Sequence, residues 1–192
     1  MKLKLVKAVM FALAIIFTSA SYAQQGDQAE MMKKWQEYMT PGPVHQQFAN
    51  MTGKWKATIT QYMGGQESKS EGIATYEMIL GGRYMKSTYK GNMMGMEFEG
   101  MGLDAFDNGT KEFISVWLDN MGTGVMTLKG KLDSQTRTVT YWGSMYDPMT
   151  GKDAKVKTLM KEIDANNFTF EMFSVEDGKE TKNMHIAYTR AK

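Results

Sequence analysis

Apolar and polar residues alternate along the chain from Lys54 to its end, in stretches of roughly 8 to 12 residues. In the last stretch Met184, Ile186 and Tyr188 share one face of an extended strand, and His185 and Ala187 share the other. Alternation of this kind is typical of a β-strand that has one face in a core and one in water. The pattern therefore predicts an all-β domain.

Nine clusters of turn-forming residues separate these stretches, so ten strands are predicted. Asn-Gly and Asp-Gly pairs supply the positive φ angles that tight hairpins need. Because every connection is short, successive strands are expected to pair in antiparallel fashion, and a meander of ten strands leaves two open edges unless it closes. We therefore predict a closed, lipocalin-like barrel. The turn clusters lie at residues 64–65, 81–82, 92–95, 107–109, 119–122, 133–134, 147–153, 164–167 and 177–178.

Alternation also assigns the inner face of several strands. In the first strand Trp55, Ala57 and Ile59 oppose lysine and threonine side chains, and in the ninth Phe168 and Phe170 oppose Thr169 and Glu171. The stretches around Trp117 and Trp142 are apolar on both faces, so their orientation stays open. The inward residues expected to line a ligand site are Trp55, Ile59, Phe168, Phe170, Met172, Met184 and Tyr188.

A short amphipathic helix is predicted ahead of the barrel. Asp27 and Glu30 have the spacing of a capping box, and Pro41-Gly42-Pro43 ends the helix. Its apolar side is formed by Met31, Met32, Trp35 and Met39. Two interpretations are open: the helix packs on the barrel, or it is an arm that binds a partner or a second copy of the chain.

Residues 1–23 have the layout of a signal peptide. Three lysines precede an uncharged apolar run over residues 8–17, which is too short to span a bilayer, and small residues follow up to Ala23. Cleavage before Gln24 is expected, with export to the periplasm or the medium. The predicted organisation is a signal peptide at 1–23, a helix and linker at 24–43 and a barrel at 44–192.

Composition narrows the range of partners. Without the predicted signal peptide the chain has 20 basic and 21 acidic residues. This near-neutral balance lacks the excess of basic residues that is typical of a nucleic-acid-binding protein. The chain has no cysteine, so its core must supply stability without disulfides. It has 20 methionines, which serve as adaptable apolar side chains where leucine is scarce.

The start of the predicted barrel resembles that of lipocalin-type barrels, the calycins. In that group a short helix leads into a Gly-x-Trp sequence on the first strand, and a basic residue near the end of the last strand packs across the tryptophan. Gly53-Lys54-Trp55 and Arg190 occupy those two places. The resemblance implies that Trp55 closes one end of the barrel and that Arg190 covers its ring by a cation–π contact.

A resemblance to one family of secreted bacterial proteins covers nearly the whole chain after residue 23. It includes His45, Gly53-Lys54-Trp55 and the terminal Tyr188-Thr189-Arg190. That family is known only as a domain of unknown function, so the resemblance implies a barrel and a bacterial source but no activity. The other similar segments are Leu80 to Tyr84, Phe98 to Asp107 and Trp117 to Asp119.

The sequence offers residues for three kinds of chemistry and favours none of them. Met93, Met94, Met96 and Met101 could offer thioether ligands to Cu(I), but methionines are spread over nearly every strand. A histidine on the last strand, as in nitrobindin-like haem proteins, would be His185, but its predicted orientation is outward. Arg83, Asp104 and Asp119 are the only candidates for a polar centre. No nucleophile motif, phosphate loop or metal spacing occurs, so no catalytic residue, cofactor or metal is assigned.

Two classes of function remain. The first is a protein that binds a small apolar or amphipathic molecule inside the barrel, lined by methionines and aromatic residues. The second is a non-catalytic interaction module with a filled barrel and a partner-binding N-terminal helix. Methionine and aromatic residues on the inner face suit a ligand and a filled core equally, so the sequence leaves both open.

Overall fold

The computed structural model describes residues 27–93 and 95–192. The predicted signal peptide at 1–23 lies outside the described residues. The chain divides into two compact units, Met1–Thr40 and Pro41–Lys192. None of the helices in the described ranges is both long enough and apolar enough to span a bilayer.

The described part of the first unit is a helix over residues 27–39, as the capping-box pattern predicts. Two ion pairs between residues four apart support it, Lys34–Glu30 at 2.6 Å and Lys33–Glu37 at 3.9 Å. The helix ends at Met39, two residues before Pro41, which cannot continue the hydrogen-bond ladder.

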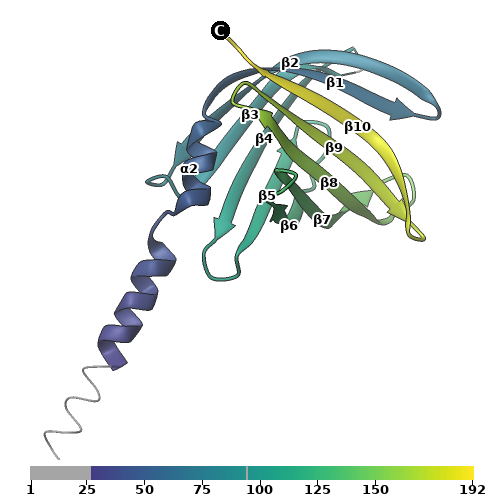
Figure 1. Ribbon diagram of the computed structural model, residues 1–192. Coiled ribbons are helices and arrows are strands. Elements are labelled where there is room, and N and C mark those ends of the chain that lie inside the picture. The colour runs from purple at the N-terminus through teal and green to yellow at the C-terminus, as the bar shows by residue number, and fades with distance from the viewer. Residues whose placement is uncertain (1–26, 94) are drawn as a thin grey trace, which may run out of the picture. The chain divides into compact units, whose positions relative to one another are not determined.

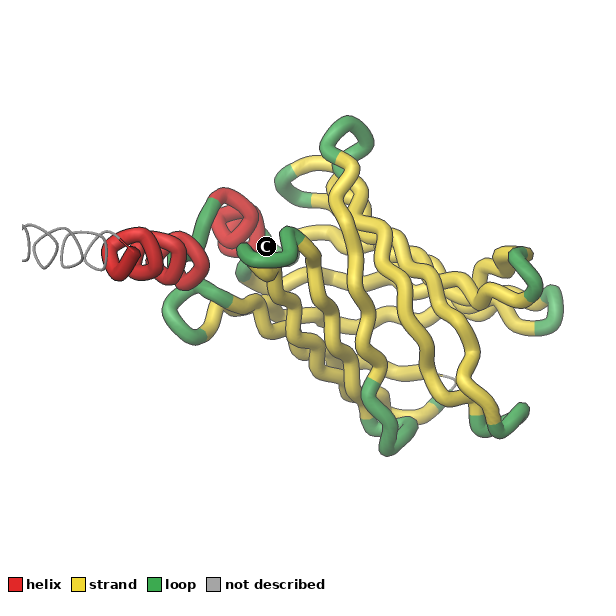
Figure 2. Tube along the Cα trace, turned by 90° about the horizontal axis from the view of Figure 1, so that it is seen from below, coloured by secondary structure: helices red, strands yellow, loops and turns green. Residues whose placement is uncertain are grey.

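The second unit begins with the helix α2 (Pro43–Asn50), whose first turn starts on Pro43. The Nδ1 atom of His45 accepts a hydrogen bond of 3.0 Å from the backbone N–H of Gly42, so this histidine caps the helix. His45 and Phe48 are the buried residues of α2. In Figure 2 the helix and the C-terminus lie at the same end of the barrel.

Ten antiparallel strands follow and form a closed barrel in the order β1-β10-β9-β8-β7-β6-β5-β4-β3-β2, which confirms the predicted meander (Figure 1). The hairpin between β9 and β10 turns on Asp177 (φ 49°) and Gly178 (φ 79°), the positive angles that an Asp-Gly turn provides. The strands are β1 (Gly53–Met63), β2 (Gln66–Ile79), β3 (Tyr84–Met93), β4 (Met96–Asp107), β5 (Glu112–Asp119), β6 (Met126–Asp133), β7 (Thr138–Asp147), β8 (Lys152–Asp164), β9 (Asn167–Glu176) and β10 (Lys179–Arg190).

The register of the strand pairs decides which side chains point inward. Ala57 of β1 is opposite Tyr188 of β10, and Tyr188 is opposite Phe168 of β9, so these side chains share the inner face. The register also settles the two strands that alternation left open. Trp117 on β5 is opposite Gly102 on the inner face, whereas Trp142 on β7 points outward and is 40% exposed.

Aromatic rings on the inner face lie against glycines of neighbouring strands. A Cβ atom on Gly100 would overlap with the ring of Trp117, and a Cβ atom on Gly72 or Gly91 would overlap with the phenol of Tyr89. The glycines thus leave room for large rings to lie along the wall, which is the cross-strand aromatic–glycine pairing that stabilises glycine-containing strands. Rings that lie along the wall take less of the barrel's cross-section than rings that point at its axis.

Candidate functional site

One end of the barrel is closed by Trp55 and Arg190. Trp55 is 2% exposed, and its indole N–H donates to the Met51 carbonyl at 2.8 Å. The Arg190 guanidinium lies 4.2 Å from the centroid of the Trp55 ring and donates to the carbonyls of Thr52, Asn50 and Ala165 at 2.9, 2.7 and 3.2 Å. The contact joins β1, β10, the end of α2 and the β8–β9 turn. Arg190 therefore covers the Trp55 ring, as the resemblance to lipocalin-type barrels implies.

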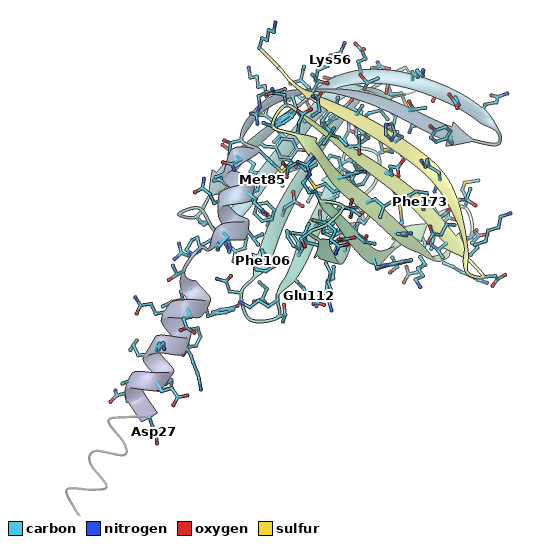
Figure 3. All side chains as sticks on the ribbon, viewed as in Figure 1. Asp27, Lys56, Met85, Phe106, Glu112 and Phe173 are labelled. Atoms are coloured by element: carbon cyan, nitrogen blue, oxygen red, sulfur yellow. The ribbon has the colours of Figure 1, made fainter. Side chains whose placement is uncertain are left out.

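Aromatic rings complete this closed end. Phe106 lies beside α2 in Figure 3, and its ring contacts His45 at 6.1 Å and Phe113 at 5.0 Å between centroids. Phe48 of α2 contacts the Phe113 ring at 6.0 Å. Burial lowers the pKa of His45, and the positive charge of Arg83 lowers it further, so His45 is neutral at pH 7. We call the following six residues the aromatic plug: His45, Phe48, Trp55, Phe106, Phe113 and Phe168.

The structure places all seven predicted lining residues on the inner face, but it divides them between two regions. Trp55 and Phe168 are buried in the aromatic plug with their rings 4.8 Å apart, and Tyr188 stacks on Phe168 at 4.2 Å. The other four, Ile59, Phe170, Met172 and Met184, lie further toward the opposite end of their strands.

Several inward side chains keep accessible surface although the wall around them is closed. Phe170, Met172 and Met184 are only half-buried, as are Trp117 and Met126 on the opposite side of the barrel. An inward side chain with accessible surface borders space that water can enter, either the interior or its mouth. A core filled with side chains would leave such positions fully buried.

A polar layer lies next to the aromatic plug, and sequence reasoning identified only part of it. Asp104 on β4 points inward between Met85 and Ser115 and is hydrogen-bonded to the Ser115 side chain. Tyr76 on β2 and Tyr188 on β10 are hydrogen-bonded to each other through their side chains. We use the name polar layer for six residues: Tyr76, Asp104, Ser115, Tyr141, Thr158 and Tyr188.

Burial dominates the electrostatics of this layer. Removal from water raises the pKa of Asp104 to about 6, and the hydrogen bond from Ser115 only partly offsets this rise. Asp104 is half-buried on the inner face of β4. Burial and the negative charge of Asp104 also raise the pKa values of Tyr76 and Tyr141, so the phenols stay neutral.

Two buried hydroxyls near this region have no hydrogen-bond partner. Thr158 on β8 is completely buried, and its Oγ1 atom is unpaired, as is the phenol oxygen of Tyr89. A buried hydroxyl without a partner costs about 1 to 3 kcal/mol. Tyr141, a member of the polar layer, is the cross-strand neighbour of Thr158.

Exposed methionines gather at the other end of the barrel. The strands alternate in direction, so the β1–β2, β3–β4, β5–β6 and β7–β8 turns all lie at the end opposite α2. Among the described residues, five methionines on these turns or the adjoining strand ends are exposed, from 39% for Met145 to 92% for Met149. We call them the methionine rim: Met63, Met96, Met121, Met145 and Met149.

The structure separates the residues of the other candidate sites. Arg83 is an exposed turn residue that donates to the Leu80 carbonyl at 3.2 Å. Asp119 is opposite Gly100 on the inner face, four residues along β4 from Asp104, and accepts from the Trp117 indole at 2.8 Å, so the three residues do not form one polar centre. His185 points outward with its Nδ1 atom 3.4 Å from the Glu171 carboxylate.

The methionines considered for copper are only partly brought together. Met93 and Met96 are paired across the β3–β4 turn, but Met101 lies on the outer face of β4, and Met94 lies outside the described residues. Across residues 27–93 and 95–192, no three His, Cys, Asp or Glu side chains are grouped in a way that could hold a metal ion.

The fold and this inner face define a class: a closed ten-stranded barrel with one plugged end and a polar layer inside it. The sequence profile of the family described as "Protein of unknown function (DUF1579)" matches residues 40–190, and the chain belongs to that family. No curated protein matches the chain in sequence.

A solved structure shows the same fold. The crystal structure of Rv2717c from M. tuberculosis is similar, with a TM-score of 0.60 and 12% identity, over 80% of this chain and 100% of that chain. At this identity the likeness concerns the fold alone. A redesigned β-barrel, b11L5F_LGL, is matched with a TM-score of 0.39 and 16% identity, over 76% of this chain and 95% of that chain.

Proposed function

We propose that the barrel binds a small apolar or amphipathic molecule in its interior. The observation that carries the proposal is the accessible surface of inward apolar side chains, above all Phe170, Met172 and Met184, inside a closed wall. Binding sites of this kind are concave and mostly apolar, with a few convergent polar groups. The polar layer supplies such groups next to the plugged end, and the methionine rim offers adaptable apolar side chains at the other end.

A charge placed on the inner wall tests the proposal. We expect Phe170→Glu to weaken binding of N-phenyl-1-naphthylamine, a neutral apolar fluorescent probe, at least tenfold, because a carboxylate would have to be buried against it. The measurement is a fluorescence titration of the probe with protein, with circular dichroism as the check on folding.

The matched control is Phe173→Glu, on the same strand but on the outer face. Phe173 lies against the ammonium groups of Lys157 and Lys182 at 5.6 and 5.5 Å from its ring centroid, so a carboxylate is tolerated there and probe binding should not change. If Phe170→Glu does not fold, Met172→Trp fills the interior without adding charge and should also weaken binding. Unchanged binding in a folded inner-face variant would contradict the proposal.

A second candidate is an interaction module that works through the helix over residues 27–39. The observation that favours it is the exposure of Met31, Met32, Trp35 and Met39, each about half exposed, on one stripe of that helix. Deletion of residues 24–40 should convert a self-associated protein into a monomer, as measured by sedimentation velocity. Residues 41–50 are kept because His45 and Phe48 belong to the aromatic plug. If the deletion variant keeps the same number of chains per particle as the original protein, this role in self-association is contradicted.

We also propose that the protein is exported with cleavage between Ala23 and Gln24. The basic, apolar and small-residue segments before Gln24 support this proposal. The intact mass of protein recovered from the periplasm or medium should correspond to a chain that begins at Gln24. Ala23→Arg should block the cleavage, and recovery of uncleaved chain from the cytoplasm of cells that express the original sequence would contradict export.

A further inference from the structure

We propose that the ligand is an amphipathic amine, whose ammonium group binds at Asp104 and whose apolar part extends from the polar layer toward the methionine rim. This inference rests on the proposed binding of a small molecule in the interior and names the class of that molecule. Three observations carry it: an inward carboxylate without a cation, aromatic faces around that carboxylate, and an unpaired acceptor oxygen nearby.

The carboxylate of Asp104 has no positive partner among the described residues. No ion pair involves it, and its hydrogen bond to Ser115 brings no charge. Between the two ends of the barrel, the inward positions of the described strands include no lysine or arginine; Arg190 lies at the plugged end over Trp55. Buried charges are ordinarily paired, so an unpaired inward carboxylate marks the place where a ligand cation would sit.

The groups around Asp104 suit an ammonium ion. Tyr76, Tyr141 and Tyr188, from three other strands, lie near enough to interact electrostatically with the Asp104 carboxylate. Neutral phenols offer acceptor oxygens and negative ring faces, both of which attract an ammonium group. The unpaired Oγ1 atom of Thr158, next to Tyr141, is a further acceptor inside the barrel.

The position of Asp104 also sets the direction in which the ligand lies. Strand β4 reaches the plugged end of the barrel at Asp107, three residues after Asp104. Phe106 of the aromatic plug is the next inward position after Asp104. A head group there is blocked on the plug side, so its apolar part must extend the other way, along Phe170, Met172 and Met184. A carboxylate head group would meet the Asp104 charge with no inward cation to offset it.

Three probes that share one alkyl chain separate the head group from the tail: dodecylamine, dodecan-1-ol and dodecanoate, titrated below their micelle concentrations by isothermal calorimetry. At pH 7.5 we expect dodecylammonium to bind at least tenfold more tightly than dodecanoate. From pH 7.5 to pH 5 the affinity for dodecylammonium should fall about tenfold, because protonation of Asp104, with a pKa of about 6, competes with the ligand cation. The affinity for dodecanol should stay constant within twofold.

The variant Asp104→Asn should remove the preference for dodecylammonium and its pH dependence, while dodecanol still binds. Glu99→Gln, on the outer face of the same strand and paired there with Lys90, is the matched control and should change neither. Equal binding of all three probes, or a preference for dodecanoate, would overturn the head-group assignment and leave the proposed binding function intact. Failure of all three to bind would overturn both, and the pH series on the unsubstituted protein decides the case even if the variant does not fold.

Discussion

Arg190→Ala is expected to destabilise the barrel by about 4 kcal/mol. The guanidinium donates to three backbone carbonyls, of Thr52, Asn50 and Ala165, and covers the Trp55 ring at 4.2 Å. Hydrogen bonds from a charged donor contribute about 1.5 to 3 kcal/mol each, and a cation–π contact about 0.5 to 2 kcal/mol, with losses that are not additive. The measurement is urea unfolding followed by circular dichroism.

Two further variants show whether the geometry of the guanidinium or its charge is responsible. Arg190→Lys keeps the charge but cannot reach three carbonyls at once, so it should recover less than half of the lost stability. Lys56→Ala, on the outer face of β1, removes an exposed ion pair with Glu71 at 2.8 Å and should cost less than 1 kcal/mol. An Arg190→Ala protein as stable as the Lys56→Ala protein would contradict the closing role of Arg190.

Asp104→Asn is expected to stabilise the protein at neutral pH. The folded-state pKa of Asp104 is about 6, against 3.8 for an ordinary aspartate, so between these values the folded state holds a proton that the unfolded state has lost. Stability therefore falls as pH rises from about 4 to about 6, by about 3 kcal/mol in total, and stays lower above pH 6. Asparagine has no such titration, so the variant should lack this fall when urea midpoints are measured from pH 4 to pH 8.

A turn aspartate provides a control with the opposite sign. The carboxylate of Asp164 accepts hydrogen bonds from the Asn166 backbone and the Asn167 side chain, which lower its pKa. The stability it contributes is present above the unfolded-state pKa and is lost as pH falls, so Asp164→Asn should destabilise the protein at neutral pH and not in acid. If Asp104→Asn behaved like Asp164→Asn, Asp104 would be a structural residue and its role in a ligand site would be contradicted.

Most of the fold could be predicted because it depends on local signals. Each of the nine turn clusters lies at a hairpin, and alternation assigned β1, β8, β9 and β10 to the correct faces. The strands of Trp117 and Trp142 could not be oriented, since both faces of each are apolar. What decides them is packing that no local pattern contains: Trp117 fits inward over Gly100, and Trp142 lies outside under Lys155, 4.8 Å from its ring centroid.

The candidate site was harder to predict because it depends on closure. Tyr76, Asp104, Tyr141 and Tyr188 come from β2, β4, β7 and β10, and only the register of the closed barrel brings them into one layer. The sequence offers Asp104 as a candidate but groups it with Arg83, an exposed turn residue, and with Asp119, which is opposite Gly100 and is hydrogen-bonded to Trp117. A signal that could have separated them is sequence context: Asp104 lies within a strand and not in a turn, where turn chemistry would explain an aspartate.

The methionine rim also has a chemical consequence. A thioether that projects into solvent is open to peroxide and related oxidants, which convert methionine into its polar sulfoxide. Met149 is 92% exposed and Met63 is 60% exposed, whereas Met85 in the core is fully buried, so within the barrel oxidation would begin at the mouth and reach the core last. Each added oxygen would make the mouth wetter without touching the aromatic plug or the hydrogen-bonded wall, so the rim can take up oxidative damage while the fold persists.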